Sequence, residues 1–146
     1  MAPLPHRTLA QTERGYAMAG HGSIHWTELN TFAPDKARAF YETLLGWSFE
    51  AVPMAGGSYL VASRNGTMVA GIFDMKLGGL PETVPSHWLT YMAVDDVDAS
   101  ARATEAAGGR VLRAPWDVPG VGRVAIIQDA AGAGLGLITP TPDEPT

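Results

Sequence analysis

The sequence predicts an α+β fold built from two tandem βαβββ modules. The first observation is a repeat, because residues 21–50 return in degraded form as residues 87–112. One offset of 63 residues aligns the acidic helix starts and the glycines that follow the helices, namely Asp35 with Asp98 and Gly46 with Gly109. The second observation is that short alternating segments, typical of strands, flank both helical patterns.

Composition places the chain among small globular proteins and excludes several functions. The formal charge of −5 comes with no basic stripe that would bind nucleic acid or an anionic membrane. The 146 residues include no cysteine, which excludes disulfides and thiolate metal sites and fits a reducing compartment. No apolar run approaches the roughly twenty residues that span a bilayer. We expect a soluble, cytoplasmic protein that binds neither nucleic acid nor membrane.

Local composition divides the chain into a domain and two polar ends. Prolines and mixed polarity mark both ends, and a Gly- and Pro-rich stretch separates the repeats. The expected boundaries are a flexible arm (residues 1–21), a single domain (residues 22–139) made of module one (22–75), a linker (76–86) and module two (87–139), and a tail (140–146).

Turn and cap residues set the elements of the first module. Pro34 suits a first helical turn, Gly46 suits a left-handed helix end, and Asn65-Gly66 is typical of a two-residue hairpin. Strands are expected over residues 23–30, 47–52, 58–63 and 67–73, with a helix from Asp35 whose apolar stripe is Ala37, Phe40, Tyr41, Leu44 and Leu45.

The second module repeats this order with a weaker pattern. Its alanine-rich helix is closed by Gly108-Gly109, and a long loop with two prolines carries Trp116. The expected elements are strands over residues 87–94, 110–113, 123–128 and 133–138, a helix over residues 97–107 and the loop over residues 114–122.

The motifs of both modules point to a known family. They are Ala39-Phe40-Tyr41 and Leu45-Gly46-Trp47 within residues 26–47, then Val94–Ala99, Gly108-Gly109-Arg110 and Gln128–Gly132. In this arrangement the chain resembles the vicinal oxygen chelate superfamily, the group of glyoxalase I, extradiol dioxygenases, and fosfomycin- and bleomycin-resistance proteins. The resemblance covers about residues 22–139 and implies that the two modules curl into a cup.

The same resemblance implies a metal site in the metal-dependent members. There, one His or Gln comes from each leading strand, and one further residue, usually Glu, comes from the last strand of each module. Carried over by the local motifs, these positions fall on Trp26, on Leu89, on Gly136 and on or beside Ala70. None of these side chains can ligate a divalent transition metal. We therefore expect no metal and no other cofactor.

Three residues are candidates for catalysis. Glu28 shares a strand face with Trp26, and the repeat offset pairs it with Tyr91. A carboxylate and a phenol across an apolar cup would serve as general base and hydrogen-bond donor. His87, on the face of Leu89 and Tyr91, is the third candidate. The alternatives are a rim carboxylate at Glu28 and a histidine that only hydrogen-bonds a loop.

Five residues are candidates for ligand binding. Trp26 replaces a family ligand and would give a flat apolar wall for an aromatic molecule. Asn30 and Leu89 share the strand faces that point into the cup. Trp116 would act as a lid or anchor its loop. Arg123 would receive an anionic group or pair with a nearby aspartate.

Three functions remain open from the sequence. The first is binding of a small, apolar or aromatic organic molecule without the usual metal. The second is a metal-independent lyase or isomerase that acts on a small carbonyl or enolisable substrate with Glu28 as base. The third is a metal-dependent glyoxalase or dioxygenase with a rebuilt site around Glu28 and His87. In each case we expect a small-molecule partner and a homodimer.

Overall fold

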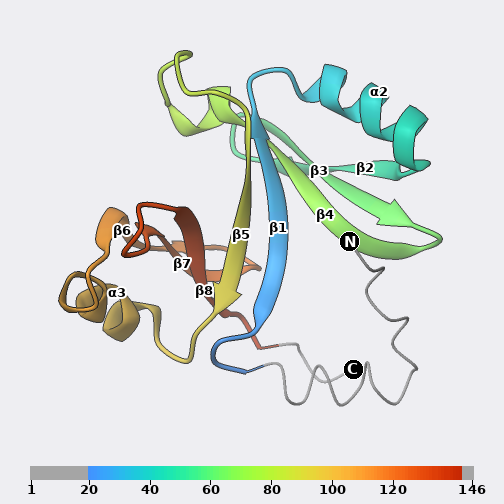
Figure 1. Ribbon diagram of the computed structural model, residues 1–146. Helices are drawn as coiled ribbons and strands as arrows, with labels where there is room; N and C mark the ends of the chain where they lie inside the picture. The colour runs from blue at the N-terminus through green and yellow to red at the C-terminus, as the bar shows by residue number, and fades with distance from the viewer. Residues whose placement is uncertain (1–19, 143–146) are drawn as a thin grey trace. The chain divides into compact units, whose positions relative to one another are not determined.

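The computed structural model describes residues 20–142, so most of the expected arm and tail lies outside the described residues. Within that range two βαβββ sets follow one another, separated by a short 3-10 helix (Figure 1). This confirms the α+β class and the element order that the repeat predicted. No helix among residues 20–142 is long and apolar enough to cross a membrane. The elements are β1 (Ile24–Thr31), α2 (Pro34–Leu45), β2 (Ser48–Met54), β3 (Gly57–Arg64), β4 (Thr67–Asp74), η1 (Met75–Gly78), β5 (His87–Ala93), α3 (Val97–Ala106), β6 (Arg110–Val118), β7 (Gly122–Gln128) and β8 (Gly134–Pro140).

The chain forms two compact units. Among the described residues, the first unit is Trp26–Thr90, and the second combines residues 91–142 with residues 20–25. In the first unit the strand order is β2-β3-β4-β1, with β1 parallel to β4 and the other neighbours antiparallel. In the second unit the order is β5-β8-β7-β6, with β5 parallel to β8 and the others antiparallel. The two mixed sets have the same topology, as expected of two copies of one module.

In the first unit, α2 covers one face of the strands. The core consists of the buried residues Leu29, Leu60 and Ile72, with Ala37, Tyr41 and Phe49 packed against them. Ile72 is in register with both Leu29 and Leu60, so the three core residues share a face. Because side chains alternate along a strand, Glu28 on β1 and Gly71 on β4 lie on the opposite face, away from α2.

α2 has the expected ends but a different apolar face. It begins at Pro34 and is closed by Gly46, whose φ of 68° is left-handed. Ala37 and Tyr41 pack on the core. The rest of the predicted stripe is exposed, with Phe40 at 56%, Leu44 at 62% and Leu45 at 47%. The helix therefore contacts the strands along one edge of its stripe only.

The β3–β4 hairpin confirms the Asn65-Gly66 prediction. Asn65 has φ of 50° and Gly66 has φ of 80°. Positive φ at both central residues matches the twist of the flanking strands. The register of the hairpin shifts between Ala62 and Ser63, which a sequence pattern does not reveal.

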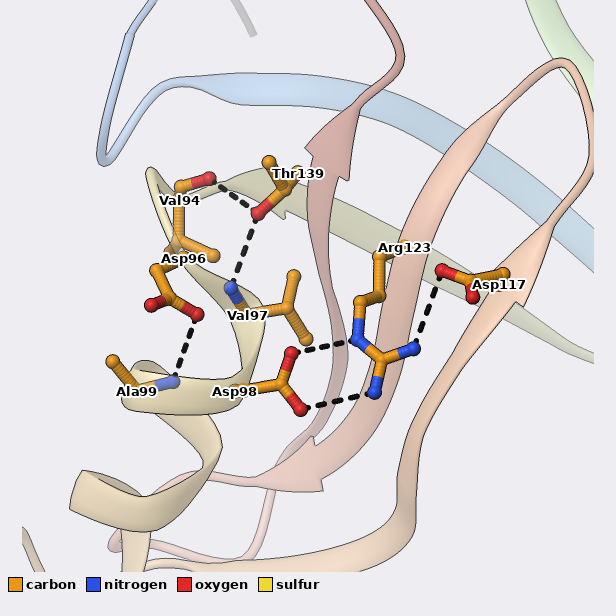
Figure 2. A network of polar contacts seen from close by, with 8 residues as sticks. All are labelled: Val94, Asp96, Val97, Asp98, Ala99, Asp117, Arg123 and Thr139. Atoms are coloured by element: carbon orange, nitrogen blue, oxygen red, sulfur yellow. Dashed lines mark hydrogen bonds and ion pairs between the residues drawn. The ribbon is translucent and has the colours of Figure 1, made fainter.

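In the second unit, α3 packs on the corresponding face. The core consists of Val94, Val97, Ala125, Ile127 and Leu137, with Val111 and Leu135 packed against it. The side chain of Asp96 accepts a hydrogen bond from the Ala99 amide and caps the helix (Figure 2). Thr139 on β8 donates to the carbonyl of Val94 and accepts from the amide of Val97, so it ties β8 to the entry of α3.

Two segments differ from the predicted loops. β6 continues to Val118, so Trp116 lies on a strand and not on a loop. Register shifts in β6 accommodate its proline and irregular pattern. The stretch after β4 forms η1, which buries Met75 completely. Tertiary contacts therefore order segments that glycine and proline content alone marked as irregular.

Candidate functional site

The sheet register places Glu28 and Tyr91 at equivalent positions of the two units. Glu28 on β1 pairs with Gly71 on the parallel strand β4. Tyr91 on β5 pairs with Gly136 on the parallel strand β8. The repeat offset thus identifies structurally equivalent residues. It also fixes the first-unit counterpart of Gly136 as Gly71, next to Ala70.

A tyrosine ring occupies the space that a side chain at position 71 would fill. A Cβ atom on Gly71 would lie 2.6 Å from Cε1 of Tyr59 and closer still to Cζ and the phenol oxygen. Tyr59 stands two residues before Val61, the β3 partner of Gly71, so its side chain points to the same face and lies over β4. Tyr59 was not among the site residues predicted from the sequence, because its position over β4 depends on this register. The available signal was a glycine in the strand that neighbours a tyrosine-bearing strand.

Three side chains of the first unit form a directed hydrogen-bonded chain. Nε1 of Trp26 donates to the phenol oxygen of Tyr59 at 3.0 Å, and this phenol donates to Oε2 of Glu28 at 2.7 Å. The direction follows from the chemistry, because an indole N–H can only donate. Glu28 is 9% exposed, so the phenol supplies a nearly buried carboxylate with a hydrogen-bond donor.

The other first-unit candidates have different surroundings. Asn30 is 7% exposed, and its Nδ2 lies 3.5 Å from the Glu28 carbonyl oxygen, which is a long contact. Leu89 is buried on β5. His87 is exposed at the start of β5, and its Nδ1 lies 2.8 Å from the carbonyl oxygen of Pro85. The imidazole of His87 is thus held by the preceding loop.

The second unit repeats the combination of glycine and tyrosine. A Cβ atom on Gly136 would lie 2.9 Å from Cγ of Tyr91 and closer still to Cδ1 and Cε1. The ring of Tyr91 therefore lies over the backbone of β8. Each unit has an aromatic ring over the glycine of its last strand, although Tyr59 comes from an antiparallel neighbour and Tyr91 from the parallel leading strand.

Trp116 shares the face of the second unit that lies away from α3. It pairs with Val124 on β7. Ile126, two residues further along β7, pairs with Gly136, so Trp116 points to the face that carries Gly136. The Arg113 guanidinium stacks on the indole of Trp116, 3.5 Å from the ring centroid.

Arg123 points to the other face and is held by two carboxylates (Figure 2). Its Nε and Nη2 donate to Asp98 at 2.6 and 3.0 Å, and its Nη1 lies 3.2 Å from Asp117. The hydrogen bond with Asp98, followed by that with Asp117, raises the pKa of Arg123 above its usual value. The same hydrogen bond lowers the pKa of Asp98. Arg123 therefore links its own strand β7 to α3 and to β6. Its side chain lies on the opposite face of the strands from Tyr91.

The residues at the inherited ligand positions do not fit a divalent metal. Gly71 and Gly136 offer no side chain, and Trp26 and Leu89 offer no ligating atom. Within residues 20–142, no group of three or more His, Cys, Asp or Glu residues could hold a metal ion.

Comparison with known proteins establishes the family. Residues 23–137 match the Glyoxalase/Bleomycin resistance protein/Dioxygenase superfamily. The chain belongs to this superfamily, whose members share the vicinal oxygen chelate fold. The match includes both leading strands, β4 with Gly71, and the part of β8 that carries Gly136.

Curated relatives carry two kinds of name. The Mycobacterium tuberculosis protein named "Putative glyoxylase CFP32" is 40% identical over 84% of this chain and 46% of that protein. The anthracycline biosynthesis protein DnrV of Streptomyces peucetius is 35% identical over 80% of this chain and 46% of that protein. The chain therefore spans about half the length of these relatives.

Solved structures share the fold at low sequence identity. Methylmalonyl-CoA epimerase from Mycobacterium tuberculosis has a TM-score of 0.56 and 19% identity, over 83% of this chain and 89% of that one. The hypothetical protein BH1468 from Bacillus halodurans has a TM-score of 0.64 and 8% identity, over 86% of this chain and 99% of that one. At these identities the likeness shows the fold alone.

Because the ring of Tyr59 fills the space above Gly71, adding one methyl group at this position should have a large effect on stability. We expect Gly71→Ala to lower the free energy of unfolding by about 1–3 kcal/mol, because the new Cβ overlaps the Tyr59 ring. Urea unfolding followed by circular dichroism measures the change. Gly134→Ala is the matched control, since a Cβ there meets no atom within 4 Å. Equal stability of the two variants would contradict the placement of Tyr59.

The Asp98–Arg123 pair predicts a contribution to stability that depends on pH. Because folding lowers the pKa of Asp98, its contribution is present above the unfolded value of about 3.9 and is lost as the pH falls through the folded value. Both side chains are more than a third exposed, so the effect is modest. We expect Asp98→Asn to flatten the fall in melting temperature between pH 5 and pH 2. An unchanged fall in melting temperature in Asp98→Asn would contradict the assignment.

Proposed function

We propose that this chain binds a small, apolar or aromatic organic molecule on the strand face that carries Trp26, Tyr59 and Glu28, without a metal at the family's ligand positions. The observation that carries the proposal is the hydrogen-bonded chain of these three side chains. It places one carboxylate oxygen, one phenol and one indole on the face away from α2. Such a mixture of aromatic surface and a few fixed polar groups is typical of small-molecule sites.

The relatives support an aromatic ligand. DnrV, and DauV of Streptomyces sp. strain C5 at 34% identity, are both named anthracycline biosynthesis proteins. Anthracyclines contain fused aromatic rings that bear hydroxyl and carbonyl groups. A ligand of this general type would stack on Trp26 and present a polar edge to Glu28. For this chain we propose only a ligand of this general chemistry, an aromatic molecule with a polar edge.

A second candidate function is metal-independent proton transfer on an enolisable carbonyl compound. It is favoured by Glu28 itself, since a nearly buried carboxylate with one oxygen held by Tyr59 is suited to act as a general base. In this candidate Glu28 removes a proton from the carbon next to the carbonyl, and His87 of the same unit donates a hydrogen bond to the carbonyl oxygen. Glu28 then returns the proton to another carbon, which gives an isomer, or gives it to a departing group, which completes an elimination.

Replacement of the carboxylate separates the two functions. If the chain only binds its ligand, Glu28→Gln keeps a hydrogen-bond acceptor, and we expect less than about a tenfold loss of affinity in a tryptophan-fluorescence titration with hydroxylated aromatic probes. If the chain is an enzyme, turnover of an enolisable thioester or ketone falls by about 10²–10⁴-fold in the same variant.

Metal content provides the control for both functions. Protein purified without chelator or affinity metal should contain far less than one metal ion per chain, before and after incubation with Zn²⁺, Ni²⁺, Mn²⁺ or Fe²⁺. Binding and any turnover should be indifferent to a chelator. A ratio near one ion per chain with chelator-sensitive binding would contradict the proposal and support a rebuilt metal site.

We also propose that the chain forms a homodimer through α2. Phe40 and Leu44 on this helix are exposed and lie beside Tyr41. Burying one such side chain in an interface would contribute about 1.5–3 kcal/mol to the free energy of association. We expect Leu44→Glu to convert a dimer to a monomer in sedimentation-velocity experiments. Thr43→Glu adds the same charge to the neighbouring exposed position and should leave the dimer intact. A wild-type monomer at high concentration, or a dimeric Leu44→Glu variant, would contradict this assembly.

A further inference from the structure

We infer that Tyr59 is a positioning residue that keeps Glu28 a hydrogen-bond acceptor, so that the site selects neutral ligands that carry a hydroxyl or amide hydrogen. The inference rests on the proposed function, because it names the class of ligand for the same site. It goes further in assigning the selectivity to a residue that does not occupy any of the inherited ligand positions.

Two hydrogen bonds orient the hydroxyl of Tyr59. Gly71 provides the space in which the ring lies, since any Cβ there would overlap it. Trp26 donates to the phenol oxygen at 3.0 Å and cannot accept in return. The single phenol hydrogen is therefore directed at Oε2 of Glu28, 2.7 Å away. Oε2 of Glu28 is an acceptor as a consequence.

The directed phenol favours the ionised form of the carboxyl group. Burial to 9% exposure disfavours a charge, whereas a hydrogen bond donated to the charged form favours it. An ionised carboxylate has only acceptor sites, while a protonated carboxyl group also donates. A ligand hydroxyl gains a charge-assisted hydrogen bond from the carboxylate, a methyl ether gains none, and an organic anion is repelled.

The same unit contains a matched comparison. Nε1 of Trp88 donates to the phenol oxygen of Tyr41 at 3.2 Å, which is the same indole-to-phenol contact as that between Trp26 and Tyr59. Tyr41 belongs to α2 and packs on the opposite face of the strands from Glu28. Tyr41→Phe therefore removes an equivalent hydroxyl away from the proposed site.

Three probes with one ring system test the selectivity by calorimetric titration at pH 7. They are 2-naphthol, 2-methoxynaphthalene and 2-naphthoate, which differ only in the group on the ring. For the wild-type chain and for Tyr41→Phe we expect naphthol to bind at least about tenfold more tightly than the ether, as a charge-assisted hydrogen bond implies, and naphthoate to bind weakest. For Tyr59→Phe we expect the preference for naphthol to fall below about threefold.

The ratio of the two affinities gives a readout that a purely structural role would not move. A general loss of structure weakens the binding of naphthol and ether alike, whereas removal of the phenol donor weakens the binding of naphthol alone. If Tyr59→Phe does not fold, Trp26→Phe keeps an aromatic ring, removes the donor to Tyr59 and should lower the preference for naphthol.

The outcomes separate the inference from the proposed function. If none of the three probes binds, the proposed function itself fails. If the naphthol and the ether bind equally to the wild type, or if Tyr59→Phe keeps the wild-type preference, aromatic binding stands and the inference is overturned. A preference that is lost equally in Tyr41→Phe would also overturn it.

Discussion

The hydrogen-bonded chain of Trp26, Tyr59 and Glu28 in the first unit depends on Gly71, which has only a hydrogen atom where other residues carry a side chain. β4 lies between β3, which carries Tyr59, and β1, which carries Glu28. A phenol on β3 can reach a carboxylate on β1 only by lying across the backbone of the strand between them. Any side chain at position 71 would close that path. Gly71 thus allows a side-chain hydrogen bond between β3 and β1, which are not neighbours in the sheet.

The second unit meets the same constraint in another way. The ring over Gly136 comes from Tyr91 of the neighbouring parallel strand, so it does not have to cross an intervening strand. On the α3 side, Arg123 is paired with two aspartates. The two copies have therefore kept one topology and diverged in the chemistry of the face away from the helix. One copy offers a carboxylate, and the other offers a phenol with an indole from Trp116.

Much of this arrangement could be predicted from the sequence, because it depends on local rules. The left-handed glycine after α2 and the Asn65-Gly66 turn each follow from the conformational freedom of one or two residues. The offset that pairs Glu28 with Tyr91 is consistent with the register, in which each residue pairs with a glycine of the neighbouring parallel strand.

The parts that could not be predicted depend on contacts between distant segments. The role of Tyr59 requires the β3–β4 register, which a bulge shifts within the hairpin. Trp116 was expected on a loop because prolines surround it, but pairing with β7 holds that segment as a strand. The exposed half of α2 has the same origin, since helical spacing defines a stripe and only packing decides which edge is buried.

The ring above Gly71 also restricts how this protein can change over evolutionary time. Every glycine codon is one nucleotide away from a codon for aspartate or glutamate, the residue types that could return a carboxylate to the last strand. Here that single step places the new Cβ inside the ring of Tyr59. An acidic residue at this position of β4 therefore requires that the ring of Tyr59 move or be replaced.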